Sequence, residues 1–332
     1  MRTVAELEEH LARPSQALVD DLGGLDGDLL ILGAGGKLGP SLVRLALNAT
    51  RGKRRVYAVS RFSEPGLADA LAEEGADVVR ADVADVDALP EAANVVFLVG
   101  AKFGTRGREH ATWYTNAYLP GRVAERYRGS RIAALSTGNV YPLVPVVSGG
   151  SVEGDPLGPV GDYAMSCLGR ERVMSHFSET YGTKLALIRL NYAVEMRYGV
   201  LVDLARKILD GTPIDLATGQ VNVVWQGYAN EVTLRSLLLA DAPPYTLNVS
   251  GPELISVRQA ALALGDALGR EPVFTGEEAP TALLSNAARC HRLFGYPSIT
   301  PAELIEHTAR WVADGGPLLD KPTRFERRDG QF

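Results

Sequence analysis

Three glycines near the start of the chain have the spacing of a phosphate-binding turn. The stretch "LLILGAGGKLG" places Gly33, Gly36 and Gly39 in a GxxGxxG pattern, directly after an apolar run and before a helical pattern. Glycine permits a tight turn and a close backbone approach, and the start of the next helix presents unpaired N–H groups to an anion. In this setting the pattern predicts a site for the pyrophosphate of a dinucleotide, with Lys37 and Leu38 inside the turn. The alternative is a turn that is merely structural.

The end of the second apolar run distinguishes the two nicotinamide cofactors. An acidic side chain there would accept from the ribose 2′-hydroxyl of NAD, whereas an arginine accommodates the 2′-phosphate of NADP. The run "VYAVSRF" ends in Ser60 and Arg61 without a carboxylate, and Lys37 adds a second cation. We therefore expect NADP(H) to be favoured over NAD(H). Asp82 and Val83, after the third run, fall where the adenine would lie, although Asp82 could equally cap a helix.

Six apolar runs alternate with helical patterns over the first 192 residues. The runs fall at 28–36, 54–61, 76–83, 94–101, 131–141 and 184–192, and the helical patterns between them at about 38–48, 65–74, 115–127 and 162–181. Continuous apolar strands separated by helices indicate a parallel sheet that is covered on both faces. The predicted fold class is therefore α/β, a doubly wound parallel sheet, with its ligand crevice outside the carboxyl ends of the strands.

The alternation of apolar runs and helical patterns divides the chain into parts. Residues 1–27 form an N-terminal helical extension, and residues 28–190 form the dinucleotide-binding domain, to which 221–249 return. Beyond residue 191 the pattern becomes irregular, so we expect 191–220 and 250–320 to form a smaller C-terminal substrate lobe over the crevice. We expect a strand at 219–228, where the sequence is "GQVNVVWQGY". We expect residues 321–332 to form a loose or partner-packed tail.

Composition excludes several classes of protein. The 332 residues are 46% hydrophobic and carry a formal charge of -6, which argues against a nucleic-acid partner or an anionic membrane surface. The two cysteines cannot build a disulfide framework, the five histidines show no metal-ligand spacing, and no apolar run is long enough for a membrane span. We expect a cytoplasmic protein.

Several motifs, in order along residues 28–315, resemble those of the extended short-chain dehydrogenases/reductases, the NAD-dependent epimerase/dehydratase family. They are "GAGGKLG", "ADV" at 81–83, "VFLVGAK" at 96–102, Asn116 in the following helix, "LSTGNVYP" at 135–142, "YAMSCLGRE" at 163–171 and "NVSGPE" at 248–253. The resemblance implies a Rossmann-like domain, and it adds Val99, Gly100, Ala101 and Asn116 to the expected cofactor site. It also implies a homodimer paired through the helices near 115 and 165.

The resemblance also assigns the catalytic roles. Tyr163 matches the tyrosine that serves as acid/base, and Thr137 matches the hydroxyl that polarises the substrate oxygen. Cys167 stands where the family has a lysine, which holds the nicotinamide ribose and lowers the pKa of the tyrosine. A neutral thiol supplies neither effect.

Three interpretations of Cys167 remain open. Another cation substitutes for the lysine, with Lys102 in "VGAKFG" the best candidate, and Arg170 less attractive because it can point to a different depth. A reaction run only as a reduction tolerates the loss, since a tyrosine with its ordinary pKa is already protonated. In the third interpretation the protein binds a dinucleotide without turnover, as a noncatalytic sensor.

The residues near the substrate favour a carbohydrate. In the stretch "VWQGYANEV", Val224 stands where members of the family often have an arginine that contacts the diphosphate of a nucleotide sugar. A nucleotide-sugar substrate is therefore less favoured. Trp225 could stack on a sugar ring beside Gln226, or it could simply pack in the core. Further border residues are Asn139, Tyr141, Asn191 and Tyr192. We expect an oxidoreductase acting on a sugar, sugar acid or similar polyhydroxylated carbonyl or alcohol, with a nucleotide-sugar epimerase or dehydratase as the alternative.

Overall fold

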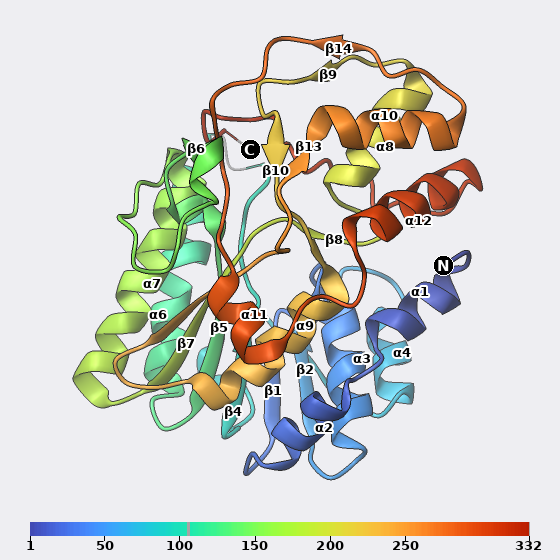
Figure 1. The fold of residues 1–332 in the computed structure, drawn as a ribbon. Helices are drawn as coiled ribbons and strands as arrows, with labels where there is room; N and C mark the ends of the chain where they lie inside the picture. Colours follow the sequence, from blue (N-terminus) through green and yellow to red (C-terminus); the bar gives the residue numbers. More distant parts are fainter. Residues whose placement is uncertain (105–106, 332) are drawn as a thin grey trace.

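A seven-stranded parallel sheet forms the centre of the molecule, as the computed structural model, which describes residues 1–104 and 107–331, shows (Figure 1). The strand order is β3-β2-β1-β4-β5-β7-β12, with every neighbouring pair parallel. The strands are β1 Leu29–Leu32, β2 Val56–Ser60, β3 Asp77–Arg80, β4 Asn94–Phe97, β5 Arg131–Thr137, β7 Lys184–Leu190 and β12 Tyr245–Val249. The predicted doubly wound α/β fold is confirmed.

Helices cover both faces of the sheet, which is why its strands are apolar throughout. Leu30, Leu32 and Phe97 pack toward one face, whereas Leu29 and Ile31 pack toward the other. The first face carries α6 (Leu119–Arg126) and α7 (Gly161–Tyr181), which follow the short α5 (Glu109–Trp113) and a π-helical turn η2 (Tyr114–Tyr118). The second carries α2 (Gln16–Gly23), α3 (Gly39–Thr50), α4 (Leu67–Glu73), α9 (Gln226–Arg235) and α11 (Ala288–Phe294).

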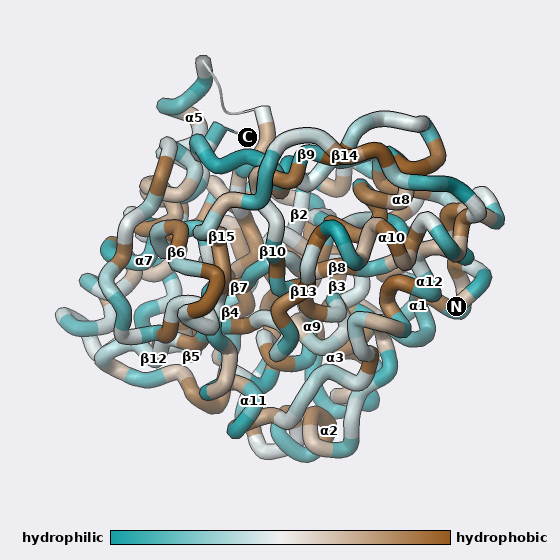
Figure 2. The backbone as a smooth tube through the Cα atoms, turned by 45° about the horizontal axis from the view of Figure 1, so that its top comes forward, coloured by the Kyte–Doolittle hydropathy of each residue, from teal (hydrophilic) through white to brown (hydrophobic). Residues whose placement is uncertain are grey.

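A smaller lobe sits beside the carboxyl ends of the strands (Figure 1). Its helices α8 (Val200–Asp210), α10 (Val257–Leu268) and α12 (Pro301–Ala313) share one apolar core. Two-stranded pairings complete the lobe and its border with the sheet: β8 (Ala193–Val194) with β11 (Val224–Trp225), β10 (Gln220–Val221) with β13 (Ile255–Ser256), β9 (Ile214–Asp215) with β14 (Phe274–Thr275), and β6 (Val144–Pro145) with β15 (Thr281–Ala282). Figure 2 shows polar stretches concentrated on the outer loops and helices.

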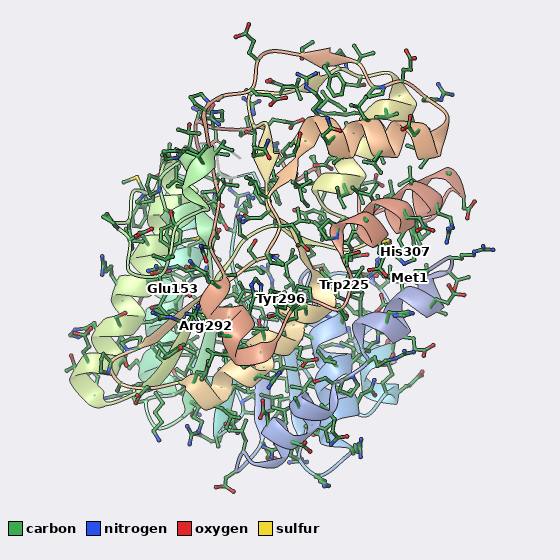
Figure 3. All side chains as sticks on the ribbon, viewed as in Figure 1. Met1, Glu153, Trp225, Arg292, Tyr296 and His307 are labelled. Atoms are coloured by element: carbon green, nitrogen blue, oxygen red, sulfur yellow. The ribbon has the colours of Figure 1, made fainter. Side chains whose placement is uncertain are left out.

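The two ends of the chain both pack on this lobe. Leu7 and Leu11 of α1 (Val4–Leu11) belong to its apolar core, and the amino group of Met1 lies 3.5 Å from Nδ1 of His307 on α12 (Figure 3). The expectation of a loose tail is wrong, because Phe325 is buried in the same core. Burial of an aromatic ring gives this segment the apolar contact that its polar sequence hides.

The stretch predicted as one strand at 219–228 is also different. It forms two bridges of two residues each, β10 and β11, and then turns into α9 at Gln226. The apolar residues of both bridges are buried. A short apolar run of this kind is compatible with a strand and with a buried turn. None of the helices in the described ranges, 1–104 and 107–331, has the length and apolar character of a bilayer span.

Candidate active site

The glycine turn joins β1 to α3 at the carboxyl edge of the sheet. Gly33 has a φ of 93°, and a Cβ on Gly39 would lie 2.2 Å from the carbonyl oxygen of Ala34, so neither position accepts a side chain without rearrangement. α3 starts at Gly39 with no side-chain cap. The N–H of Gly39 donates to the carbonyl oxygen of Gly36 at 3.2 Å and Pro40 has no N–H, so the amides that this helix start leaves for the pyrophosphate of a dinucleotide include those of Lys37 and Leu38, just before the helix.

A cavity of about 380 Å³ opens beside this turn. Its wall runs from the glycine turn past the ends of β4 and β5 to α7, and from there to the loop after β7 and the start of α8. Of the expected site residues, these line it: Gly33, Gly36, Lys37, Leu38, Gly39, Gly100, Lys102, Thr137, Asn139, Tyr163, Cys167, Asn191 and Tyr192.

Tyr163 and Thr137 meet inside the cavity. Tyr163 lies in the first turn of α7, Thr137 ends β5, and their side chains are hydrogen-bonded. Burial raises the pKa of Tyr163 well above the ordinary value for a phenol, and the neighbouring Cys167 raises it further, while Thr137 and Arg170 oppose the shift. Burial also raises the pKa of the Cys167 thiol. Both groups are therefore protonated in the resting protein.

Lys102 and Arg170 are two of the cations that line the cavity with this pair. The ammonium of Lys102 lies 5.7 Å from the centre of the Tyr163 ring, and burial lowers its pKa to about 8. Arg170 also lines the wall, one helical turn beyond Cys167, and only 4% of its surface is exposed. Arg170 therefore lines the same cavity as Lys102.

Lys37 does not point where a 2′-phosphate would need it. Its ammonium donates to the carbonyl oxygen of Ala193 at 2.9 Å and lies 3.3 Å from the centre of the Tyr198 ring, on the border of the lobe. Burial lowers its pKa to about 7, against the opposing charge of Glu195. Of the two cations expected at the 2′-phosphate, only Arg61 stays beyond the second strand, at 3.6 Å from the carboxylate of Asp82.

The remaining expected cofactor residues surround the turn without lining the cavity. A Cβ on Gly35 would lie 2.8 Å from Oγ of Ser60, so Ser60 closely approaches the turn. Asp82 accepts from the N–H of Ala84, and Val83 is buried. Asn116 holds both backbone groups of Ala101 at 2.8 Å and donates to Ser166 on α7. Asn116 thereby fixes the loop after β4, including Val99, against the helix that carries Tyr163.

Three of the expected substrate residues do not reach the cavity. Trp225 lies in the core of the lobe above α9 (Figure 3), and the amide of Gln226 donates to Ser41 of α3 at 3.0 Å. Tyr141 is buried in one apolar cluster with Cys167 of α7, and its hydroxyl donates to Asn248 of β12 at 2.8 Å. All three side chains are buried, and the hydroxyl of Tyr141 and the amide nitrogen of Gln226 are bonded within the protein, although the side-chain oxygen of Gln226 has no hydrogen-bond partner among the described residues. Val224 is equally buried.

Other lining residues had no sequence signal. Tyr198 comes from the loop before α8, and Lys321 and Thr323 come from the supposed tail. The backbone N–H and the hydroxyl of Thr323 both donate to Asp203 of α8, at 2.8 and 2.6 Å. The folded chain brings Lys321 and Thr323 to the cavity, which the sequence alone does not predict. Within the described part of the chain, no group of His, Cys, Asp and Glu could hold a metal ion.

Comparison with known families agrees with this site. Residues 29–223 match the profile of the NAD dependent epimerase/dehydratase family, and the chain belongs to that family. The predicted kind of protein, an enzyme of an NAD-dependent family, is thereby confirmed. No curated protein sequence matches the chain closely enough to serve as a relative.

Several solved structures share this fold over most of the chain. The chain is similar to the UDP-glucuronic acid 4-epimerase of Bacillus cereus, solved with NAD, at 16% identity and a TM-score of 0.72 over 86% of this chain and 96% of that one. It is similar to the dTDP-glucose 4,6-dehydratase of Streptomyces venezuelae, also with NAD, at 19% identity and a TM-score of 0.72 over 86% and 96%. The UDP-glucose 4-epimerase of Thermotoga maritima matches at 16% identity and 0.67 over 87% and 99%.

Proposed function

We propose that the chain is a nicotinamide-dinucleotide-dependent oxidoreductase of the epimerase/dehydratase type, acting on a sugar, sugar acid or similar polyhydroxylated carbonyl or alcohol. The observation that carries the proposal is the meeting of Tyr163 and Thr137 in one cavity with the glycine turn. The turn fits a dinucleotide because Gly33 and Gly39 leave backbone where side chains would otherwise stand.

The residues of the chain divide the chemistry between them. When bound, the nicotinamide supplies or accepts the hydride. The hydroxyl of Thr137 donates to the side-chain oxygen of Asn139 at 3.0 Å in this structure, and it turns to donate to the substrate oxygen when substrate binds. Tyr163 passes its phenolic proton to the same oxygen as the carbon is reduced. Because burial keeps Tyr163 protonated, the resting site is set for reduction.

Turnover tests the proposal directly. The purified protein is mixed with NADH or NADPH and a panel of ketoses and keto sugar acids, and the loss of nicotinamide absorbance is followed. In parallel the protein is incubated with NAD and UDP- or dTDP-sugars, and a changed sugar is detected by chromatography, because epimerisation or dehydration causes no net oxidation of the dinucleotide. Saturable oxidation of the dinucleotide by at least one compound supports the proposal. Tight dinucleotide binding without turnover on any compound would instead favour a sensor.

The nucleotide-sugar alternative comes from the similar structures, some of which were solved with UDP-glucose or UDP-glucuronic acid. Against it, Val224 is buried and cannot meet a diphosphate. Turnover confined to the UDP- or dTDP-sugars would decide for this alternative.

Dinucleotide choice depends on Arg61, since Lys37 is turned toward the lobe. The solved neighbours contain NAD, whereas Arg61 favours a 2′-phosphate. We expect NADPH to bind about fivefold more tightly than NADH, and Arg61→Ala to abolish the difference. We expect only this modest difference in affinity because the guanidinium of Arg61 is exposed to solvent, which weakens its interaction with a phosphate. Equal affinities of the unaltered protein, measured by fluorescence titration, would contradict the preference.

The charge of the cavity favours an acidic sugar. Its lining includes Lys37, Lys102, Arg170 and Lys321 and, among the described residues, no carboxylate. A dinucleotide pyrophosphate brings two negative charges. The remaining positive charge suits a carboxylate or phosphate on the substrate.

Lys321 is the cation of this set that lies closest to solvent, so its removal should affect acidic substrates alone. We expect Lys321→Gln to raise KM for a sugar acid about fivefold, or about 1 kcal/mol, and to leave KM for the matching neutral sugar unchanged. Steady-state kinetics on the pair, with the remote surface variant Lys53→Gln as control, measures this. Equal changes for the acidic and the neutral sugar would contradict the prediction.

Association through the helices of the first face is a further proposal. Tyr114, Tyr118 and Met165, on η2 and α7, are 45%, 57% and 47% exposed. Apolar side chains grouped on one helical face suit a homodimer interface. Light scattering of the wild type against Tyr118→Asp tests this, since only the wild type should have the mass of two chains.

A further inference from the structure

We propose that Arg170 provides the positive charge that stabilises a phenolate on Tyr163, in the role that the resemblance gives to a lysine at the position of Cys167. The inference rests on the proposed function. Arg170 is a positioning residue in this account, because it acts on the substrate through the tyrosine.

The helix places the three groups on one stripe. Tyr163, Cys167 and Arg170 lie at positions i, i+4 and i+7 of α7, a spacing that repeats on the same helical face. All three line the same cavity. The long side chain of Arg170, at i+7, folds back along the helix toward Cys167, at i+4. It therefore brings a positive charge to the neighbourhood where the shorter side chain of Cys167 has none.

The guanidinium of Arg170 is held by neutral acceptors. Its Nε donates to the backbone oxygen of Asn116 at 3.1 Å, Nη2 donates to the side-chain oxygen of Asn116 at 3.3 Å, and Nη1 donates to the backbone oxygen of Leu135. In residues 1–104 and 107–331, no carboxylate lies within salt-bridge distance of Arg170. By contrast, Arg189 is as buried, and it is paired with Glu171 at 2.8 Å.

A buried cation without a counter-ion is costly unless a negative charge joins it. The three hydrogen bonds occupy three of the five N–H groups of the guanidinium, and the other two have no acceptor in the described part of the chain. The backbone makes room for the group, since a Cβ on Gly100 would lie 3.1 Å from Nη2. The charge of Arg170 is thus fixed in place and not neutralised.

Lys102 is the competing cation, and pH separates the two. Burial brings the pKa of Lys102 to about 8, so its charge is present below pH 8 and lost as the pH rises through that value. A guanidinium keeps its charge throughout. The other titratable side chains that line the cavity or lie near it are Cys167 on α7, Lys37 in the glycine turn, Asp203 on α8, Lys321, Tyr192 and Tyr198. Among residues 1–104 and 107–331, Arg170 is the one arginine that lines the cavity, and its charge lowers the pKa of the Tyr163 phenol.

The first test measures the tyrosine without cofactor or substrate. A polyfluorinated tyrosine, whose phenol loses its proton several pH units below that of tyrosine, is incorporated at position 163. Its titration in the dinucleotide-free protein is followed by difference absorbance against Tyr163→Phe, in the otherwise wild-type protein and with Arg170→Gln, Arg170→Lys or Lys102→Met. We expect Arg170→Gln to move the titration upward by about one pH unit or more. Arg170→Lys should keep most of the wild-type value, and Lys102→Met should leave the high-pH titration unchanged. Arg172→Met, an exposed arginine on the same helix, is the matched control.

The second test is rescue. Cys167→Lys restores a cation at the neighbouring position, so it should return the titration of Arg170→Gln to within about half a pH unit of the wild-type value. Thermal unfolding of each variant identifies a loss of fold, and Arg170→Lys keeps the test possible if Arg170→Gln does not fold. An unchanged titration in folded Arg170→Gln overturns the proposal, as does a rescue variant that folds but fails to shift the titration.

Turnover provides an independent readout. Where a substrate is found, Arg170→Gln should lower kcat about tenfold or more at both pH 6.5 and pH 9.5, whereas Lys102→Met should lower it only at the lower pH. The reverse pattern assigns the role to Lys102 and overturns the inference. If no compound is turned over, the titration still tests Arg170, so failure of the proposed function and failure of this inference remain distinguishable.

Discussion

Replacing Tyr163 with phenylalanine is expected to lower kcat by about 10³-fold while leaving the dissociation constant of the dinucleotide within about twofold. The substitution removes one oxygen and keeps the ring, so the walls of the cavity are preserved. What is lost is the proton that the phenol passes to the substrate oxygen. Thr137 and the glycine turn, which bind and orient, remain.

The measurement combines steady-state kinetics with calorimetric titration of the dinucleotide on the same preparation. Glu179→Gln is the control, since Glu179 is exposed on the same helix and outside the cavity lining. A Tyr163→Phe variant with kcat near that of the wild type would show that another group moves the proton. A variant that lost dinucleotide affinity as well would point to a structural role for the hydroxyl.

Replacing Arg189 with methionine is expected to lower the free energy of unfolding by about 3–5 kcal/mol. Arg189 and Glu171 are buried beneath the site, joined by two hydrogen bonds of 3.0 and 2.8 Å. Ser136 donates to the same carboxylate, and Arg189 also donates to the hydroxyl of Tyr141. Removing one partner leaves a buried charge without a counter-ion, which costs more than the pair itself contributes.

Urea denaturation followed by circular dichroism measures this loss, and two variants sharpen it. The double variant Arg189→Met with Glu171→Leu should be less destabilised than Arg189→Met alone, because no charge is stranded. Arg206→Met breaks an exposed pair with Asp320 and should cost less than about 1 kcal/mol. An Arg189→Met variant as stable as Arg206→Met would show that Glu171 finds water or protonates without cost.

The sequence predicts the parts of the fold that depend on local pattern. The apolar runs of β1 and β4 are buried on both faces, so they stand out without any tertiary information. The glycine turn is equally local, since its geometry is a property of a few consecutive residues. The long helix expected at 162–181 runs from Gly161 to Tyr181 for the same reason.

The parts that sequence could not predict depend on contacts between distant segments. Tyr141 and Trp225 are plausible sugar contacts by residue type. In the structure, however, the hydroxyl of Tyr141 donates to Asn248, and Trp225 packs in the apolar core of the lobe. Lys321 reaches the cavity because Asp203 holds Thr323. The direction of Arg170 follows from acceptors on β5 and η2. In each case the partner lies far away along the chain.

Calorimetric titration of the wild-type protein with NADH and with NADPH tests the central claim most directly. If the backbone amides beside Gly33, Gly36 and Gly39 bind a pyrophosphate, at least one dinucleotide should bind saturably, with one molecule per chain. A folded protein that gave no binding heat with either dinucleotide, and no protection from thermal unfolding, would contradict the account.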